Sequence, residues 1–338
     1  MRKTAKISII ILFSAILLCG FLFCNNNTTQ YAEAVEENET VYLGGTPIGI
    51  RAVSPYFVIT EFVNVVTIDG SFSPAQKAGL KKGDIILSVN GERPKDVEQM
   101  CKIIESSHTA DFTVKRNNEV VRRTVTPVTD IRQKAKKAGI MVKNDLSGIG
   151  TLTYVRKDKR FGALGHPIAD QYGYSDIYQS GTVYDCLILG YNRAENNKPG
   201  ELVGQIEIKK SLGAFDSNTL SGILGTLYDL PEDKTAVRVA AKGEIKPGKA
   251  TIYTTIDGKK PDFYDIEIIK TNVQPEEKEK SMVIRVTDKY LLSKTGGILQ
   301  GMSGSPIVQD GKLVGAVTHV LTADSTMGYG IYIEWMMN

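Results

Sequence analysis

Cysteine, histidine and tryptophan are scarce in this chain of 338 residues. There are four cysteines, three histidines and one tryptophan. Cys19 and Cys24 lie in the first 24 residues, which leaves only Cys101 and Cys186 for the rest of the chain. So few cysteines exclude a disulfide framework and a cysteine-based zinc site. The sequence therefore indicates neither a metal nor another cofactor.

A surplus of charge of one sign is also missing. Lys and Arg number 41 and Asp and Glu number 38, which gives a net charge of +3. Such a balance offers no electrostatic footprint for DNA or RNA, so no nucleic-acid partner is expected. Hydrophobic residues make up 42% of the chain and charged residues 23%, which excludes wholesale disorder. At roughly 150 residues per domain, the length predicts two domains and a tail.

The N-terminus carries an uncharged apolar run, residues 7–23, directly after three basic residues. A basic start followed by an apolar core is typical of an export signal or an N-terminal membrane anchor. We assign residues 1–30 to this signal or anchor and residues 31–40 to a linker, with self-cleavage expected between Asn25 and Thr40. Lipidation of Cys24 fits less well, because bulky residues precede it where small ones are required.

Residues 41–128 have the pattern of a small mixed domain. A short helix is expected to start at Ser73-Pro74, and Asn90-Gly91 is typical of a tight hairpin turn. A second helix is predicted over residues 95–106, followed by two strands. This order, together with the stretch AGLKKGDIILSVNG, resembles a PDZ domain.

The PDZ resemblance implies that a peptide binds by adding a strand to a sheet edge, beside a glycine-containing loop. We place this loop at Ile48, Gly49 and Ile50. The loop lacks the common glycine-leucine-glycine-phenylalanine form, so binding of a terminal carboxylate and binding of an internal peptide segment both remain open.

Residues 140–338 predict a β-rich domain. Short apolar runs alternate with Gly, Asn, Asp and Pro at roughly ten-residue intervals, as in an all-β barrel or sandwich. Short helical turns are expected near residues 163–169 and 288–294. Residues 209–217 and 273–280 are predicted to be loops, and the charges of the second are interpreted as solvated.

The chemical signal in this domain is GMSGSP, which centres on Ser303. A serine nucleophile needs an exposed hydroxyl and unpaired N–H donors, and small neighbours allow the tight turn that presents both. The motif and the strand, Asp-Gly turn and strand that follow it resemble the nucleophile region of chymotrypsin-like serine proteases. The resemblance implies a double β-barrel, with the N–H groups of Gly301 and Ser303 as the oxyanion hole. Met302 stands where those proteases usually have Asp or Asn. A glycine-rich turn that its serines merely cap is the structural alternative.

Two histidines compete for the role of base. His166 lies in FGALGHP, which is similar to the histidine turn of the first chymotrypsin-like barrel. His319 follows the nucleophile at a position similar to one that lines the substrate groove, so we assign it, with Thr318, to substrate contact. Spacing alone does not choose the acid among six aspartates, which are Asp170, Asp176, Asp185, Asp216, Asp229 and Asp288.

Over its whole length the chain resembles the stage IV sporulation protein B peptidase family of endospore-forming bacteria. The resemblance rests on the apolar N-terminus, the PDZ stretch, FGALGHPI, VTDKYLLSKTGGILQGMSGSPI, and GAVTHV through GYGIYIEWM. It implies His166 as the base, Asp288 as the acid and Ser303 as the nucleophile.

The same resemblance implies a place and a role. The protein would be exported into the space between the forespore and mother-cell membranes. There it would cleave the regulatory subunit of an intramembrane metalloprotease and so permit activation of a late mother-cell sigma factor. Overall, the sequence predicts a mainly β serine endopeptidase with a small α+β PDZ-like domain.

Two other classes of function fit the same residues. A membrane-anchored PDZ scaffold with a degenerate protease domain would explain Met302 and the unsettled acid. A broad-specificity quality-control protease would share every catalytic residue. Broad digestion of casein favours that protease, whereas cleavage at one or two sites favours signalling.

Overall fold

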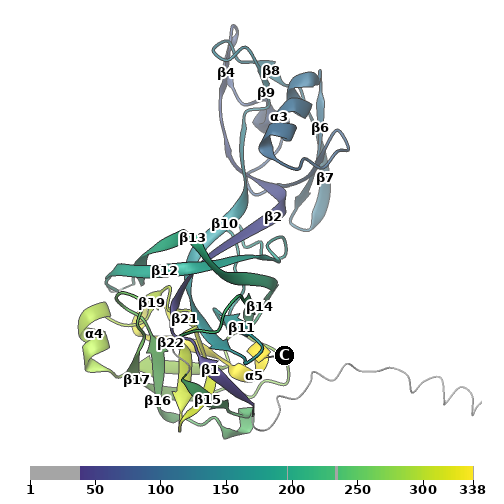
Figure 1. Cartoon of the computed structure of the whole chain (residues 1–338). Coiled ribbons are helices and arrows are strands. Elements are labelled where there is room, and N and C mark those ends of the chain that lie inside the picture. Colours follow the sequence, from purple (N-terminus) through teal and green to yellow (C-terminus); the bar gives the residue numbers. More distant parts are fainter. Residues whose placement is uncertain (1–38, 196, 233–234, 338) are drawn as a thin grey trace, which may run out of the picture. The chain divides into compact units, whose positions relative to one another are not determined.

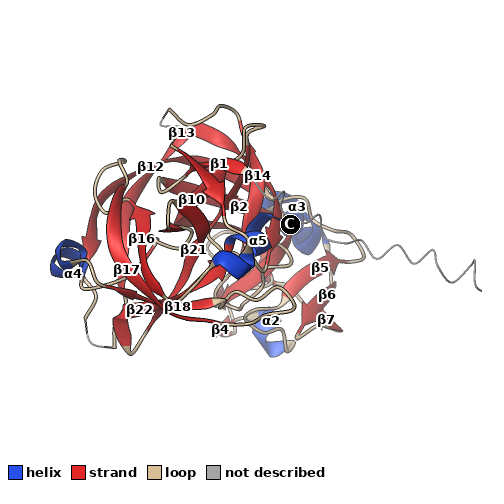
Figure 2. Ribbon diagram, turned by 90° about the horizontal axis from the view of Figure 1, so that it is seen from below, coloured by secondary structure: helices blue, strands red, loops and turns tan. Residues whose placement is uncertain are grey.

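The computed structural model describes residues 39–195, 197–232 and 235–337. The predicted signal or anchor at residues 1–30 and nearly all of the linker lie outside these residues. Strands dominate the described part and its helices are short (Figures 1 and 2). None of the helices within these ranges is both long and apolar enough to span a lipid bilayer.

Six antiparallel strands close a first barrel among the described residues. Each strand pairs with the next, and the last pairs again with the first. In order around the barrel they are β2 (Pro47–Phe62), β10 (Ile140–Val155), β11 (Arg160–Ala163), β14 (Gly222–Leu227), β13 (Gly200–Thr219) and β12 (Gly181–Asn192). Phe161, Phe215 and Ile223 fill its interior and are fully buried.

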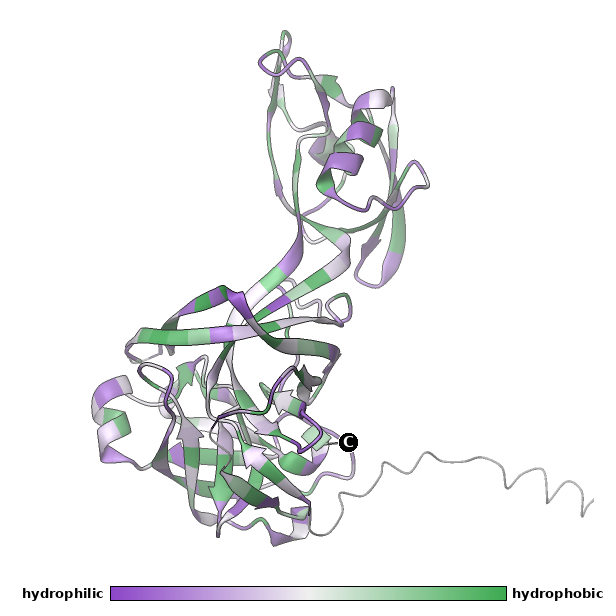
Figure 3. Ribbon diagram, in the orientation of Figure 1, coloured by the Kyte–Doolittle hydropathy of each residue, from purple (hydrophilic) through white to green (hydrophobic). Residues whose placement is uncertain are grey.

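A second barrel closes in the same way. Its strands, again in order, are β16 (Gly248–Thr254), β17 (Asp262–Thr271), β18 (Met282–Val286), β22 (Asp324–Tyr332), β21 (Lys312–Leu321) and β20 (Pro306–Gln309). Ile252, Ile266 and Met302 pack in its core. Apolar and polar residues alternate along many of the strands, as expected where one face of a strand points into a barrel (Figure 3). The chymotrypsin-like double β-barrel predicted from the sequence is therefore confirmed.

Shorter elements complete the peptidase part. They are β1 (Thr40–Leu43), β15 (Ala236–Val239), η1 (Lys242–Glu244), α4 (Lys289–Thr295), β19 (Leu299–Gln300) and α5 (Ile333–Met337). The predicted helical turn near residues 288–294 corresponds to α4. No helix forms over residues 163–169, because Leu164 and Gly165 both have positive φ angles, of 72° and 71°. Residues 209–217, predicted to be a loop, belong to β13.

The PDZ-like part is formed by the chain between the two long strands β2 and β10. Its sheet consists of the C-terminal half of β2, then β5, β6 and β7, while the start of β10 pairs with the other edge of β2. Phe57, Met100 and Phe112 lie in its core. The elements in this part are β3 (Val65–Thr67), β4 (Gly70–Phe72), α2 (Pro74–Lys77), β5 (Ile85–Val89), α3 (Val97–Ser106), β6 (Ala110–Arg116), β7 (Glu119–Val125), β8 (Val128–Thr129) and β9 (Lys136–Lys137).

The expected start of this part at residue 41 is wrong, and so is the ligand loop at Ile48, Gly49 and Ile50. These three residues lie in β2, where they pair with both β10 and β12 in the first barrel. Ile48 and Ile50 are buried, and a Cβ at Gly49 would lie 2.4 Å from the Ile206 side chain. Residues in the wall of a barrel, with both strand edges paired, cannot receive a peptide.

Candidate active site

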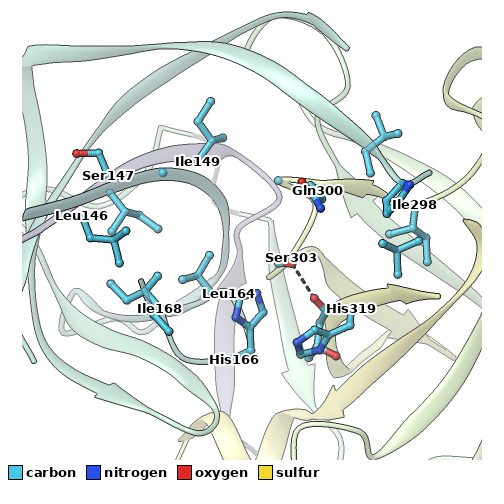
Figure 4. A pocket seen from close by; sticks show the side chains of 18 of the residues that line it. Leu146, Ser147, Ile149, Leu164, His166, Ile168, Ile298, Gln300, Ser303 and His319 are labelled. Atoms are coloured by element: carbon cyan, nitrogen blue, oxygen red, sulfur yellow. Dashed lines mark hydrogen bonds between the residues drawn. The ribbon is translucent and has the colours of Figure 1, made fainter. Parts of the chain in front are cut away.

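A cavity of about 440 Å³ is lined by residues of both barrels, and His166 and Ser303 both face it (Figure 4). Leu146, Ile149 and Ile168 form apolar walls on the side of the first barrel. The structure therefore brings together the histidine and the serine that the sequence singled out, although 136 residues separate them in the chain.

The turn that carries Ser303 lies between β19 and β20 and requires glycine on both sides. Gly301 and Gly304 have φ angles of 97° and 96°, a region that favours glycine. A Cβ at Gly304 would lie 2.1 Å from the carbonyl oxygen of Thr151, which leaves no room for a side chain. The small residues of GMSGSP are thus explained by the local backbone.

Hydrogen bonds from β10 fasten this turn to the first barrel. The Thr151 N–H donates to the carbonyl of Ser303 at 2.9 Å, and Thr151 Oγ1 donates to the carbonyl of Gly301 at 2.9 Å. Thr153 Oγ1 donates to the carbonyl of Gly304 at 2.7 Å. Three carbonyl acceptors of the turn are satisfied by one strand, which holds Ser303 in a fixed position relative to the first barrel.

Two backbone donors of the turn have no acceptor among the described residues. The N–H groups of Met302, Gly304 and Ser305 donate to carbonyl oxygens of the chain. Within the ranges that the structure describes, the N–H groups of Gly301 and Ser303 meet no acceptor. Two unpaired donors, two residues apart at the nucleophile, are the arrangement that stabilises a developing oxyanion.

Met302 and Ser305 have structural roles in this turn. The Met302 side chain is fully buried in the second barrel, and its sulfur accepts the Leu299 N–H at 3.4 Å. Ser305 is also buried, with its Oγ 2.6 Å from the Met302 carbonyl and 2.8 Å from Thr254 Oγ1. Met302 therefore replaces the usual aspartate by a core contact, and Ser303 is the serine of the motif that reaches the cavity.

The ring of His166 is fixed by a backbone carbonyl. Its Nδ1 lies 2.9 Å from the carbonyl oxygen of Pro167. Because a carbonyl oxygen only accepts, the neutral ring carries its proton on Nδ1 and keeps the Nε2 lone pair free. Burial lowers the pKa of His166, and the Pro167 carbonyl and the Glu279 charge oppose that effect. The ring is therefore neutral at pH 7, as a general base must be.

His319 packs against His166, with 4.9 Å between the ring centroids. Burial, followed by the neighbouring His166, lowers the pKa of His319 to about 4. His319 Nε2 lies 3.9 Å from Glu279 Oε2, which is too long for a hydrogen bond. His319 lines the cavity, where its ring is neutral and lies beside His166.

Glu279 is the acidic residue of this site that the sequence did not single out. It belongs to residues 273–280, whose charges the sequence pattern predicts to be solvated. In the structure it places a negative charge beside both histidine rings and raises the pKa of His166. In a run of acidic and basic residues, the sequence pattern does not show which carboxylate lies beside the histidine rings.

Thr318 acts through its backbone. Its carbonyl accepts the Ser303 hydroxyl at 2.7 Å, and its side chain is buried, with Oγ1 3.3 Å from the carbonyl of Glu279. The hydroxyl of Ser303 thus points to the Thr318 carbonyl, and the dashed line at Ser303 in Figure 4 marks this hydrogen bond.

Asp288 does not orient His166, and its expected role as the acid is corrected by the structure. Asp288 is the N-cap of α4: its Oδ1 accepts the Leu291 N–H at 2.7 Å and its Oδ2 accepts the Asp265 N–H at 3.4 Å. None of the six aspartates weighed from the sequence lines the cavity that the described residues form. The spacing of 15 residues before Ser303 reflects the position of a helix start.

Comparisons with known proteins identify the family of the chain. The family model SpoIVB peptidase S55 matches residues 134–337, and a PDZ domain model matches residues 70–115. Serine protease HTRA1 of Xenopus laevis is 36% identical over 55 residues, which are 16% of this chain and 12% of that protein.

Two solved structures from M. tuberculosis also match. The active form of the Rv3671c protease is 14% identical, with a TM-score of 0.31 over 55% of this chain and 70% of that one. An inactive serine-to-alanine mutant of Rv3671c is 13% identical, with a TM-score of 0.30 over 54% of this chain and 76% of that one. Since the SpoIVB peptidase S55 model covers more than half of the sequence, the chain belongs to this family of serine peptidases and carries a PDZ domain.

Proposed function

We propose that the protein is an exported sporulation endopeptidase that cleaves a regulatory membrane protein through Ser303 and His166. The observation that carries the chemistry is the cavity itself. It joins a serine hydroxyl, two unpaired backbone N–H groups and a neutral imidazole with a free Nε2. These are the parts that acyl transfer needs.

The first half of the reaction forms an acyl-enzyme. Rotation about the Cα–Cβ bond moves the Ser303 hydroxyl from the Thr318 carbonyl to Nε2 of His166, which takes its proton as Oγ attacks the peptide carbonyl. The N–H groups of Gly301 and Ser303 bind the oxyanion. His166 then gives the proton to the leaving amine as the C–N bond breaks.

The second half releases the acyl group. Water occupies the place of the amine and gives a proton to His166 while its oxygen attacks the acyl carbon. The acyl–Oγ bond breaks, and the proton returns to Ser303. The Pro167 carbonyl holds the ring in one tautomer throughout, and the charge of Glu279 stabilises the transient imidazolium.

Membership of the SpoIVB peptidase S55 family and the attached PDZ domain support a regulatory substrate rather than general protein turnover. The substrate proposed is the regulatory subunit of an intramembrane metalloprotease, whose cleavage permits activation of a late mother-cell sigma factor. The basic and apolar residues 1–30 support export and attachment to the membrane. The place of action proposed is the space between the two membranes of the sporulating cell.

The test is a sporulating strain in which Ser303→Ala replaces the wild-type chain. We expect normal accumulation of the variant, an uncut regulatory subunit on immunoblots and a silent sigma-factor reporter. Ser293→Ala is the matched control, because Ser293 is an exposed serine on α4. An active reporter in the Ser303→Ala strain would contradict the proposal, and broad digestion of casein by the purified protein would favour a quality-control protease.

A further inference from the structure

Asn218 is a polar residue in the interior of the first barrel. It lies near the end of β13 and is only 7% exposed. The pairing of β13 with β14 shifts in register between Phe215 and Ser217, so Asp216 is one extra residue in the strand. Because side chains alternate between the two faces of a strand, an extra residue exchanges the faces beyond it. Phe215 before the bulge and Asn218 after it therefore both point inward.

The side-chain amide of Asn218 binds the loop that follows His166. Its Oδ1 accepts the Ile168 N–H at 3.0 Å. Its Nδ2 donates to the carbonyl of Ile168 at 2.9 Å and to those of Ser175 and Tyr178, both at 3.2 Å. An amide nitrogen carries two hydrogens, so one of them is shared between two carbonyls. The amide is paired only in this orientation, because a rotated amide would place its oxygen against three carbonyl oxygens.

The peptide group between Pro167 and Ile168 connects Asn218 to the base. Its carbonyl oxygen lies 2.9 Å from Nδ1 of His166, and its N–H donates to Asn218 Oδ1. In a trans peptide these two groups point in opposite directions within one rigid plane. Fixing the N–H therefore also fixes the carbonyl that holds the ring. A hydrogen bond at the N–H polarises the carbonyl as well, which strengthens its bond to Nδ1.

The ring of His166 depends on this peptide group. Within the part of the chain that the structure describes, the Pro167 carbonyl is its one hydrogen-bond partner. Residues 164–180 form no helix or strand, so no ladder of a sheet fixes the direction of their peptide groups. The hydrogen bonds of Asn218 supply what a ladder would supply elsewhere. The side chain of Ile168 lines the cavity, so the peptide that Asn218 holds lies at the site itself (Figure 4).

We propose that Asn218 is a positioning residue that orients His166 through the Pro167–Ile168 peptide group. The inference rests on the proposed function, because it takes His166 as the base of that reaction. None of the six aspartates weighed from the sequence lines the described cavity. The orientation of the ring, which a carboxylate could otherwise set, is thus set by a neutral amide inside the barrel.

The rate at which a fluorophosphonate probe modifies Ser303 tests this role, measured against pH with the full-length protein. The Pro167 carbonyl raises the pKa of His166, so Asn218→Ala, which frees that carbonyl, should move the acid limb of the profile to lower pH. The rate at neutral pH should fall about ten- to a hundredfold, a range typical of residues that orient a functional histidine. A rate and an acid limb like those of wild type would overturn the proposal.

The direction of the shift separates orientation from simple packing. If Asn218 only packed the loop, its removal would expose the ring of His166. Because burial is the largest cause that lowers the pKa of His166, exposure would move the acid limb to higher pH. An upward shift would therefore overturn the proposal. The other groups near the ring stay in place in the variant: His319 on β21, and Glu279 and Lys280 in the loop between β17 and β18.

Asp170→Ala is the matched control. Asp170 Oδ1 accepts the N–H groups of Tyr172 and Tyr174, farther along the same loop. Its removal loosens the loop without touching the peptide between Pro167 and Ile168, so the acid limb should stay where it is. Equal shifts in Asp170→Ala and Asn218→Ala would show that loosening of the loop is sufficient and would overturn the role of Asn218.

Nitrogen-15 NMR of the imidazole rings gives a second readout that also works with the wild-type chain. His166 should carry its proton on Nδ1, and an Nε2–H tautomer would overturn the proposal. Where Asn218→Ala does not fold, Asn218→Asp replaces it, because its carboxylate still accepts the Ile168 N–H but cannot donate to the three carbonyls. Asn218→Asp should be less stable and yet keep the Nδ1–H tautomer, and loss of that tautomer would contradict the role of the peptide group.

The outcomes also separate this inference from the proposed function. An adduct on Ser303 of the wild-type chain, formed equally fast in Asn218→Ala, overturns the role of Asn218 alone. No adduct on folded wild-type protein overturns the proposed chemistry itself.

Discussion

Ser303 lies on a turn whose carbonyls are hydrogen bonded to the opposite barrel, whereas the ring of His166 is held by one carbonyl of its own neighbour. On the serine side, two glycines with positive φ angles and a buried methionine fix the backbone conformation of the turn. On the histidine side, no aspartate lines the described cavity, and the nearby carboxylate of Glu279 acts through its charge.

The comparison shows that the position of Ser303 depends on backbone conformation and hydrogen bonds, whereas the protonation of His166 depends on nearby charge. Changes to the turn that carries Ser303 should disturb folding and activity together, because the same hydrogen bonds serve both. Changes around His166 should instead shift the pH dependence, because they alter the charge beside a buried ring.

The largest effect is expected where a side chain is forced into the serine turn. Gly304→Ala places a Cβ 2.1 Å from the Thr151 carbonyl at a φ angle of 96°. We expect a loss of about 3 kcal/mol in the free energy of unfolding, measured in urea, together with loss of activity. Gly311→Ala is the control, since Gly311 also has a positive φ angle but open space around it. Equal losses in the two variants would show that close packing at Gly304 is unimportant.

A smaller effect is expected when one hydrogen bond between the barrels is removed. Thr153→Val removes the buried hydroxyl that donates to the Gly304 carbonyl and leaves that acceptor unpaired. We expect a loss of about 2 kcal/mol in the free energy of unfolding and a lower kcat. Thr153→Ser keeps the hydroxyl and should recover most of both quantities. A Thr153→Val variant as stable and active as wild type would show that this hydrogen bond contributes neither to stability nor to activity.

The histidine side should respond through pH. In the proposed mechanism the neutral form of His166 is the base, so kcat/KM should fall as pH decreases through the pKa of His166, which lies below its ordinary value of 6.5. Because Glu279 raises this pKa, Glu279→Gln should move the acid limb of the profile to lower pH. The rate at neutral pH should fall severalfold as the imidazolium loses a stabilising charge. Glu276→Gln, in the same loop, is the control, and an acid limb that stays in place or moves upward in Glu279→Gln would contradict the account.

The smallest effect is expected at Asp288. As an N-cap, its carboxylate can be replaced by the amide of Asp288→Asn at almost no loss of stability, whereas Asp288→Ala should lose about 1 kcal/mol. Activity should fall only as far as the folded fraction falls. A drop of about 10⁴-fold in kcat for a fully folded Asp288→Asn would return Asp288 to the catalytic triad.

The sequence predicts the serine half of the site far better than the histidine half. The glycines and serine of GMSGSP encode a local turn, so the motif, together with its context, singles out Ser303 as the candidate nucleophile. Neither acidic partner is encoded locally. Asp288 was implied by the family resemblance but caps a helix, and Glu279 is one of several charged residues in its segment. The orientation of His166 is set by a hydrogen bond to a backbone carbonyl, and such a bond cannot be predicted from residue types.

The boundaries of the PDZ-like part show the same limit. Ile48 and Ile50 alternate with other residues as any strand does, and the pattern does not tell in which sheet the strand pairs. A β-rich barrel or sandwich was predictable because many short apolar runs are separated by turn residues, and the resemblance to chymotrypsin-like proteases implied the double β-barrel. Closure of each barrel, by contrast, depends on pairings between distant strands.

The central claim, that Ser303 is an activated nucleophile, is tested most directly by intact mass of the purified chain after treatment with a fluorophosphonate probe. Peptide mapping then locates the adduct, and Ser303→Ala is the control. The account predicts one adduct, on Ser303, that is absent from the Ser303→Ala chain. No adduct on folded protein, or an adduct that persists in Ser303→Ala, would contradict it.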